Sequence, residues 1–432
     1  MTPVFVGFAV LLVVILGGMP IAFAMGVVGF GGVASIIGVQ PAFAMVAQIA
    51  YETGMNYGLS VVPLFILMGN FVTRAGLSEQ LYTASNAWLG HRRGGLAMAT
   101  IVACAGFSAI CGSSLATAAT MAKVSMPSMR KFGYAPSLAA GAIAAGGTLG
   151  ILIPPSVILV IYGIMTSTDI GELFIAGIVP GVIGVIGYLL AISAVTALKP
   201  ELGPPGERRS LIERLRALNG VWGVLMLFLL VIGGIYLGVF TPTEAAGIGA
   251  AGAFFFALWR RALSMRALIE VLIESAQTTT MIFFVLIGAL LFSNFMNLAG
   301  LPTALLSWVQ SLGASPTFVL LAILAIYLAL GCLLESMSMV LLTVPIFYPL
   351  MQALGFDLIW FGIVVVVVTE ISLITPPVGL NVFVLKAVLP DINTGTIFRG
   401  VTPFWVADIV RLGLIVFVPW FSLVLPQLMR AG

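Results

Sequence analysis

Long apolar stretches recur along the whole chain and are separated by short polar loops. A helix that crosses a membrane needs about 20 apolar residues, and the pattern predicts ten such spans. They cover residues 4–18, 20–38, 59–74, 136–165, 171–198, 219–240, 243–259, 268–297, 357–388 and 400–428. The segments 41–56 and 77–90 are amphipathic and predict helices that lie along the membrane interface. The sequence therefore predicts an all-α integral membrane protein.

Composition supports this fold class and narrows the chemistry. Of 432 residues, 61% are hydrophobic and only 8% are charged, which is too little charge for a soluble surface. The three cysteines lie in apolar segments without metal or disulfide spacing, and the single histidine, His91, sits in a basic loop that predicts a solvated side chain. No GxxxxGK[ST] loop for ATP is present in the sequence. With one histidine, no metal-binding cluster and few carboxylates in the sequence, a membrane-embedded enzyme is disfavoured.

Basic residues predict the orientation in the membrane. The loop 199–216 carries five Lys and Arg residues, and three more follow two spans later at 260–266. An even number of crossings places both groups on one side, which the positive-inside rule assigns to the cytoplasm. Counting back places Arg92, Arg93, Arg130 and Lys131 inside as well, with both termini outside.

The sequence contains an internal repeat. The text Asn-Phe-x-x-x-Ala-Gly-Leu at 70–77 returns at 294–301, and Leu-Gly at 89–90 returns at 312–313. At an offset of 222 residues, positions with the same residue type are Ser114 and Ser336, Pro127 and Pro349, Gly133 and Gly355, Pro154 and Pro376, and Pro155 and Pro377. Proline and glycine mark backbone geometry, so their fixed order predicts two copies of one folded unit.

The copies are predicted to have opposite topology, because basic residues flank the first and are absent from the equivalent loop near 299–315. Many secondary transporters are built from inverted repeats with the solute site where the copies meet. The predicted divisions are N-terminal scaffold helices at 1–58, a first repeat at 59–198, a cytoplasmic loop with linking helices at 199–267, and a second repeat with the last helix at 268–432.

Each repeat contains a predicted hairpin with small polar residues at its bend. The segment 94–130 has two apolar arms around Cys111-Gly112-Ser113-Ser114, and the segment 316–353 has Gly331, Glu335, Ser336 and Ser338 at its bend. We favour a re-entrant hairpin whose tip stops within the membrane, because non-helical backbone at depth is tolerated where it lines a cavity. Two short complete spans are the alternative.

A double proline interrupts the long span that follows each hairpin, in 136–165 and in 357–388. Proline cannot donate to the carbonyl four residues back, which frees the carbonyls of Gly150, Ile151, Ser372 and Leu373. A cation such as Na⁺, held by carbonyl and hydroxyl oxygens, would take up these groups. A kinked helix satisfied by neighbours and water is the alternative.

Ionisable residues at membrane depth are few, and by default they indicate function. Six are predicted there: Lys123, Glu244, Glu335, Glu370, Asp408 and Arg411. Asp408 and Arg411 are three residues apart and can neutralise each other, whereas Lys123 can extend to the interface. Glu335 at a bend and Glu370 on a broken span are the better functional candidates.

At these residues the sequence resembles the large membrane subunit of tripartite ATP-independent periplasmic (TRAP) transporters, the DctM-like family. The likeness covers essentially the whole chain. The matching text is Gly112-Ser113-Ser114-x-Ala116, Pro127 with Gly133-Tyr134, Gly150-Ile151-Leu152-Ile153-Pro154-Pro155-Ser156, Leu334-Glu335-Ser336-Met337-Ser338, and Leu373-Ile374-Thr375-Pro376-Pro377-Val378-Gly379-Leu380-Asn381.

The resemblance implies Na⁺-coupled uptake of a C4-dicarboxylate or related organic acid by an elevator motion, in a bacterial inner membrane. It implies two partners, a small four-helix DctQ-like membrane subunit, expected as a separate chain, and a DctP-like periplasmic substrate-binding protein, with Na⁺ as coupling ion and no other cofactor. The resemblance, together with the hairpin bends and the double-proline breaks, gives the candidate residues for binding solute or ion. They are Ser113, Ser114, Gly150, Ile151, Pro154, Glu335, Ser336, Thr369, Ser372, Leu373, Thr375 and Asn381. Among them, Ser113, Gly150, Ser336, Thr369 and Ser372 are the Na⁺ candidates.

Two rival functions remain open from the sequence. A stand-alone divalent-anion/Na⁺ symporter could share the inverted hairpins without needing a binding protein. A purely structural assembly subunit would tolerate loss of the bend hydroxyls.

Overall fold

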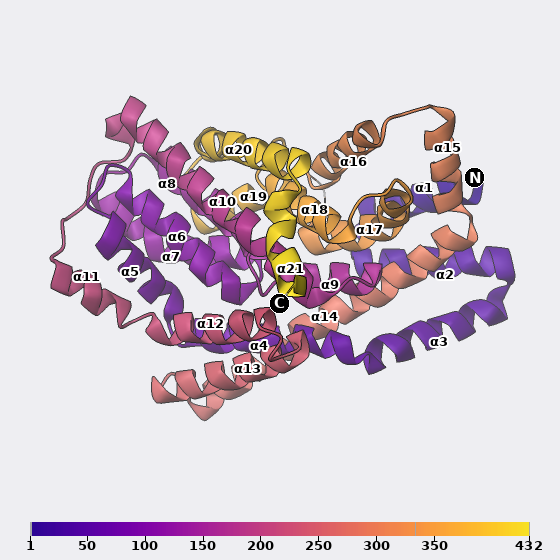
Figure 1. The fold of residues 1–432 in the computed structure, drawn as a ribbon, viewed down its shortest axis with the longest axis horizontal. Coiled ribbons are helices and arrows are strands. Elements are labelled where there is room, and N and C mark those ends of the chain that lie inside the picture. Colours follow the sequence, from indigo (N-terminus) through magenta and orange to yellow (C-terminus); the bar gives the residue numbers. More distant parts are fainter. Residues whose placement is uncertain (1, 333, 432) are drawn as a thin grey trace.

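The computed structural model describes residues 2–332 and 334–431, and all regular structure in these residues is helical (Figure 1). This confirms the predicted all-α class. The N-terminal helices are α1 (Thr2–Leu16), α2 (Ile21–Ile37) and α3 (Val39–Met55). The amphipathic segment predicted at 41–56 coincides with α3.

Seven helices of the first repeat recur in the same order in the second. The first set is α4 (Val61–Arg74), α5 (Leu77–Leu89), α6 (Gly95–Cys111), α7 (Ser114–Lys131), α8 (Pro136–Thr148), α9 (Val157–Thr166) and α10 (Ile170–Leu198). The second set is α14 (Met265–Leu298), α15 (Leu301–Ser311), α16 (Pro316–Leu330), α17 (Ser336–Ala353), α18 (Leu358–Ser372), α19 (Leu380–Val388) and α20 (Thr394–Phe417). Between the sets lie α11 (Leu211–Leu218), α12 (Trp222–Tyr236) and α13 (Pro242–Trp259), and α21 (Trp420–Ala431) ends the chain.

The backbone φ angles agree between the repeats at two matched pairs of glycines and differ at a third pair. Gly76 and Gly300 precede α5 and α15 with φ of 75° and 74°, and Gly133 and Gly355 follow α7 and α17 with φ of 72° and 83°. These left-handed conformations favour glycine over other residues. The matched pair at 90 and 313 differs, because Gly90 has φ of −58° whereas the second glycine has φ of 59°.

Within residues 2–332 and 334–431, five helical segments are long and apolar enough to cross a membrane by length and composition, namely Tyr57–Arg74, α10, α14, α17 and α20. Most other apolar helices have 10–17 residues. The two predicted broken spans are indeed each divided in two, α8 with α9 and α18 with α19, around the double prolines. Helix length alone does not decide between a re-entrant hairpin and two complete spans, because α17, the returning arm of the second hairpin, is one of these five long helices.

Glycines bring helix backbones into contact within two groups of helices. A Cβ on Gly29 of α2 would lie 2.6 Å from the backbone nitrogen of Phe292 on α14. A Cβ on Gly141 of α8 would lie 2.3 Å from the backbone of Gly400 on α20. Small residues at such crossings allow close packing where water supplies no driving force. In Figure 1, α2, α4 and α12–α14 run along the lower side, and α8, α10, α18 and α20 lie above them.

A buried ion cluster joins the upper helices. Arg411 Nη2 on α20 donates to Glu370 Oε2 on α18 at 2.6 Å and lies 2.9 Å from Asp408 Oδ1. Tyr188 on α10 donates its hydroxyl to Asp408 Oδ2 at 2.6 Å. The predicted pairing of Asp408 with Arg411 is thus present. The expectation that Glu370 serves a binding site is corrected, because its carboxylate is fully buried and pairs with this arginine.

The expectation that Glu244 lies at depth is also wrong. Glu244 is exposed and forms a capping box with Thr241, whose backbone N–H donates to Glu244 Oε2 at 2.8 Å. The spacing Thr-Pro-x-Glu is typical of a helix start, where the carboxylate satisfies a free N–H group. Lys123 is exposed on α7.

Candidate functional site: a central cavity between two hairpin tips

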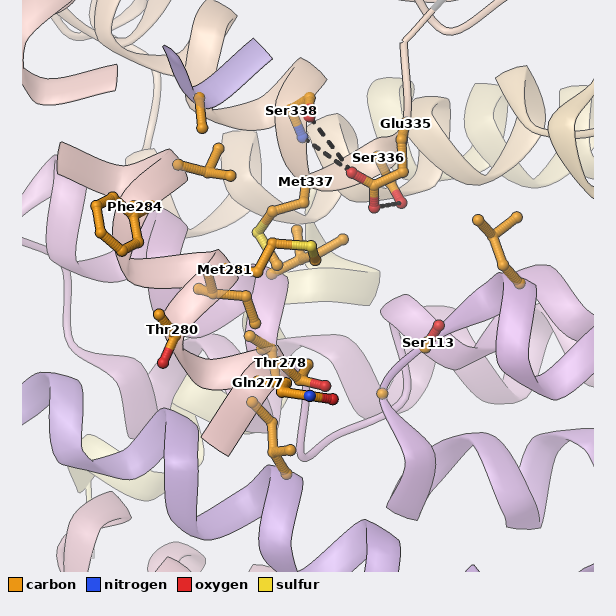
Figure 2. Close-up of a pocket in the computed structure, with 18 of the residues that line it drawn as sticks. Ser113, Gln277, Thr278, Thr280, Met281, Phe284, Glu335, Ser336, Met337 and Ser338 are labelled. Atoms are coloured by element: carbon orange, nitrogen blue, oxygen red, sulfur yellow. Dashed lines mark hydrogen bonds between the residues drawn. The ribbon is translucent and has the colours of Figure 1, made fainter. Parts of the chain in front are cut away.

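The tips of both hairpins line one cavity of about 810 Å³ (Figure 2). Ser113 and Ser114 line it from the first tip, and Glu335 and Ser336 line it from the second. Two hairpins of opposite topology bring their tips to one cavity only if both end in the interior. If either pair of arms crossed the membrane completely, its tip would lie at the far face. The shared cavity therefore favours re-entrant hairpins over two short spans.

The opposite wall of the cavity belongs to α2 and α14. It is largely apolar, with Phe23, Met281 and Phe284 among its side chains. The polar exceptions on α14 are Gln277, Thr278 and Thr280. In the view of Figure 2, the side chains of Gln277 and Thr278 point toward Ser113. Sequence reasoning missed these residues, although a polar run in the middle of the apolar span 268–297 was the available signal.

The first tip is a tight reversal that exposes a helix N-terminus. Gly112 ends α6 with φ of 62°, and Ser113 follows in extended conformation as the N-cap of α7. The Ser113 hydroxyl oxygen accepts from the backbone N–H of Ala116 at 3.3 Å. The remaining N–H groups of this turn carry the partial positive charge of the helix end, which favours an anionic group.

The second tip carries an acid at the corresponding position. Glu335 is the N-cap of α17, and its carboxylate accepts from the Ser338 N–H at 3.3 Å and the Ser336 hydroxyl at 3.4 Å. Figure 2 shows Glu335 at the edge of the cavity, and the side chain is exposed there. Its charge offsets the partial positive charge of α17. The two tips are therefore electrostatically unequal. Residue 333, in the same bend, lies outside the described residues.

At the break behind the first tip, one of the two carbonyls expected to be free, that of Ile151, has a hydrogen-bond donor. After α8 comes a short 3₁₀ turn at Leu149–Ile151, and α9 begins after the double proline with Ser156 as N-cap. The Ser156 hydroxyl donates to the Ile151 carbonyl at 2.5 Å. The chain folds back after the prolines, so a nearby hydroxyl reaches the carbonyl that the helix no longer uses.

The second break follows the same principle. The Ser372 carbonyl accepts from the Thr375 N–H at 3.2 Å, and the Leu373 carbonyl accepts from the Asn381 N–H at 3.1 Å. The expectation of carbonyls left for a cation alone is thus corrected at Ile151, Ser372 and Leu373. A carbonyl oxygen has two lone pairs, so each can still contact a cation beside its hydrogen bond.

Behind the first tip lies a buried hydroxyl that has no hydrogen-bond partner among the residues that the structure describes. Ser108 Oγ on α6 is buried, and a Cβ built on Gly150 would lie 3.1 Å from it and 3.6 Å from the carbonyl carbon of Ser113. Oxygen ligands from an unwound helix and a hairpin tip are the kind that hold Na⁺ in transporters. Sequence reasoning missed Ser108, whose only signal is a hydroxyl one helical turn before the bend.

Two Na⁺ candidates of the second repeat, Thr369 and Ser372, lie together at the end of α18. A Cβ on Gly331, at the end of α16, would lie 1.9 Å from Ser372 Oγ, so the arm packs directly on the break. Thr369 Oγ1 donates to the Val365 carbonyl at 2.7 Å, and Ser372 Oγ donates to the Thr369 carbonyl at 2.6 Å. Because each hydroxyl uses its proton on its own helix, its oxygen lone pairs remain available.

The structure thus divides the candidate residues into groups. Ser113, Ser114, Ile151, Glu335 and Ser336 line the cavity. The others lie outside its lining: Gly150, Pro154, Thr369, Ser372, Leu373, Thr375 and Asn381.

Three residues of the second group have structural partners of their own. Asn381 Nδ2 donates to the Ala144 carbonyl at 3.0 Å and links α19 to α8. Thr375 Oγ1 accepts from Trp405 Nε1 at 2.9 Å. Pro154 lines a separate apolar pocket of about 320 Å³, beside Val182 and Phe228. The role of Pro154 in a binding site stays a prediction.

Paired hairpins whose tips share one cavity, each followed by a broken helix, in a chain of apolar helices, define a multi-pass membrane transporter of inverted-repeat design. The chain belongs to the family described as "Tripartite ATP-independent periplasmic transporter, DctM component", whose model matches residues 8–421. The resemblance stated from the sequence is thereby confirmed.

Individual relatives agree with this assignment. The chain is 40% identical over 379 residues to the C4-dicarboxylate TRAP transporter large permease protein DctM of Pseudomonas aeruginosa, covering 87% of this chain and 88% of the relative. It is 33% identical over 374 residues to the sialic acid TRAP transporter large permease protein SiaM of Vibrio cholerae, covering 86% and 87%. Among solved structures, the Alcanivorax borkumensis YdaH transporter has a similar fold, with a TM-score of 0.66, 15% identity, and coverage of 89% of this chain and 88% of that chain.

Proposed function

We propose that this protein is the permease subunit of a Na⁺-coupled transporter that imports an organic acid, a C4-dicarboxylate or a related acid, across a bacterial inner membrane. The relatives support this class of solute, since one is named for C4-dicarboxylates and another for sialic acid, which share a carboxylate. A separate small four-helix membrane subunit and a periplasmic binding protein that delivers the solute complete the proposed system.

The observation that supports Na⁺ coupling most directly is the charge of the side chains that line the cavity. Among the described residues that line it, no lysine or arginine occurs, and Glu335 is the one charged side chain. An organic anion that entered this cavity would meet a carboxylate and no positively charged side chain among these residues, and like charges repel. Bound cations would reverse this balance. The Ser108 hydroxyl, which has no hydrogen-bond partner among the described residues, and the hydroxyls of Thr369 and Ser372 support the proposal, because they could serve as oxygen ligands for such cations.

The proposed motion is an elevator. The cavity lies between the hairpin tips and a wall made by α2 and α14, whose backbones are in direct contact. On this proposal α2 and α14 stay fixed as a scaffold, while both hairpins and the breaks behind them move together with solute and ions. The buried cluster around Arg411 would keep α10, α18 and α20 in one rigid body during the movement. Family membership favours this three-component system over the stand-alone symporter.

Uptake by proteoliposomes that contain the permease, the small subunit and solute-loaded binding protein tests the proposal. We expect uptake of a labelled C4-dicarboxylate to require an inward Na⁺ gradient. In Ser108→Ala, the Na⁺ concentration for half-maximal uptake should rise about tenfold or more, as expected for loss of one interaction with a charged group. Ser193→Ala is the matched control, because Ser193 is exposed and bonds only its own helix, at the Leu189 carbonyl.

Two results would count against the proposal. Uptake that is equally fast with K⁺ in place of Na⁺ would remove the ion coupling. An unchanged Na⁺ requirement in Ser108→Ala would remove the ion site behind the first tip. Loss of uptake in a Ser336→Ala protein that still assembles with its partners would exclude a purely structural subunit.

A further inference from the structure

The linker between α10 and α12 contains a short helix whose apolar face has no protein partner among the described residues. This helix, α11, begins with a capping box in which Glu213 Oε2 accepts from the Ser210 N–H at 2.8 Å. Leu211, Ile212 and Leu215 are 69%, 71% and 60% exposed. At positions i, i+1 and i+4 they occupy one side of the helix, so α11 presents a continuous apolar strip outward.

Basic residues surround this strip. The linker 199–220 and the adjoining loop 91–93 together carry seven Lys and Arg against three Glu, a formal charge of +4. Arg208, Arg209 and Arg216 are exposed. The two segments are joined by backbone hydrogen bonds, from the Gly94 N–H to the Gly203 carbonyl and from the Gly206 N–H to the Gly90 carbonyl, each at 2.8 Å.

A pair of tryptophans marks the depth at which α11 lies. Trp222 at the start of α12 and Trp259 at the end of α13 pack edge to face with ring centroids 6.1 Å apart, and they are 48% and 69% exposed. Exposed tryptophans at helix ends gather at the membrane–water interface. Only three residues separate the end of α11 at Leu218 from Trp222. Because this separation is so short, the apolar strip of α11 lies close to the level of these tryptophans.

We propose that α11 is a membrane-surface helix that buries Leu211, Ile212 and Leu215 in the inner leaflet and binds anionic phospholipid headgroups through Arg208, Arg209 and Arg216. A short helix with an apolar strip and flanking arginines is suited to an anionic lipid surface, because hydrophobic burial and charge attraction act together. This proposal depends on neither the solute nor the coupling ion.

The lipid contact has a mechanical consequence at the first hairpin. The same linker holds both cytoplasmic ends of that hairpin, since Gly203 accepts from Gly94 before α6 and the Leu202 carbonyl accepts from the Ala135 N–H before α8 at 3.0 Å. A lipid-anchored α11 therefore sets the depth of the hairpin base relative to the inner leaflet.

Spin labelling of the full chain tests where the apolar strip lies. A nitroxide on Ile212→Cys, with the three native cysteines replaced, is compared in nanodiscs of phosphatidylcholine with and without phosphatidylglycerol. We expect high collision with oxygen and low collision with a water-soluble nickel complex when phosphatidylglycerol is present. A label on Glu207→Cys, an exposed polar position of the same linker, should stay accessible to nickel. Nickel access at 212 in both lipids would overturn the proposal, as would exclusion of both reagents, which would indicate a protein partner.

Native mass spectrometry tests the arginines. The double variant R208Q/R209Q should retain phosphatidylglycerol more weakly than wild type, by about fivefold for each arginine removed. The matched control is K131Q/R399Q, which removes two exposed cations outside this linker. Equal lipid retention in R208Q/R209Q and wild type would refute the headgroup contact.

Discussion

Removing the arginine from the buried ion cluster is the most direct test of how the upper helices are held together. Arg411 is 2% exposed and serves two carboxylates, Glu370 at 2.6 Å and Asp408 at 2.9 Å. Arg411→Met keeps most of the volume and removes the charge. The two carboxylates then remain buried without a cation, and only Asp408 keeps a donor, the Tyr188 hydroxyl.

The expected loss of stability is large. Breaking a buried ion pair by removing one partner typically costs about 3–5 kcal/mol, because the remaining charge stays in a medium that cannot solvate it. With an unfolding entropy of about 2.1 cal/mol/K per residue, taken from soluble proteins, this corresponds to a fall in Tm of about 3–6 °C for a chain of this length. Thermal unfolding in detergent, followed by intrinsic fluorescence, measures the shift.

The triple variant Glu370→Gln, Asp408→Asn, Arg411→Met is the matched control. Replacing a whole buried ion cluster by neutral groups is often nearly neutral, so the triple variant should be more stable than Arg411→Met alone. The reasoning fails if Arg411→Met unfolds at the wild-type temperature. It also fails if the triple variant is the less stable of the two.

Two further predictions concern packing and pH. Gly400→Ala should destabilise the protein by about 3 kcal/mol in thermal unfolding, because the new Cβ would lie 1.9 Å from the Ser137 carbonyl oxygen, whereas Gly413→Ala, with no atom within 4 Å, should change little. Burial, followed by the nearby Arg214, lowers the pKa of His91 below its usual 6.5. The loop is therefore expected to lose stability as the pH falls from 6.5 through this lowered pKa, where His91 becomes protonated in the folded protein. Histidine NMR titration should give a higher pKa in Arg214→Gln, and an unchanged pKa would contradict the role of that arginine.

Much of the fold was predictable because local signals agree with one another. Long apolar runs gave the helices, and fixed glycines and prolines gave the repeat and the two broken spans. Glu244 was misplaced because an apolar neighbourhood in sequence was taken for depth, while the Thr-Pro-x-Glu spacing around it indicates an exposed helix start. The capping signal was in the sequence and was outweighed by hydropathy.

The site was predictable only in part. The bend hydroxyls Ser113, Ser114 and Ser336 and the acid Glu335 do line one cavity, because residues at a helix reversal are held at the tip by local backbone geometry alone. Gln277 was missed because a polar residue in an apolar span has no partner visible in sequence.

By itself, the sequence determined most of the apolar helices, the breaks at the two double prolines, and that the two halves share one design, since these depend on interactions between residues close in the chain. It did not predict α11 and α15, which lie in segments taken as loops, or the division of the predicted span 400–428 into α20 and α21. Tertiary structure decided which polar groups meet. It placed Glu370 beside Arg411, 41 residues away, and Asn381 beside Ala144, 237 residues away. It also turned the freed carbonyls toward new donors within the same chain. A buried polar group binds whichever partner the packing of distant helices brings within hydrogen-bond distance, and no local pattern encodes that arrangement.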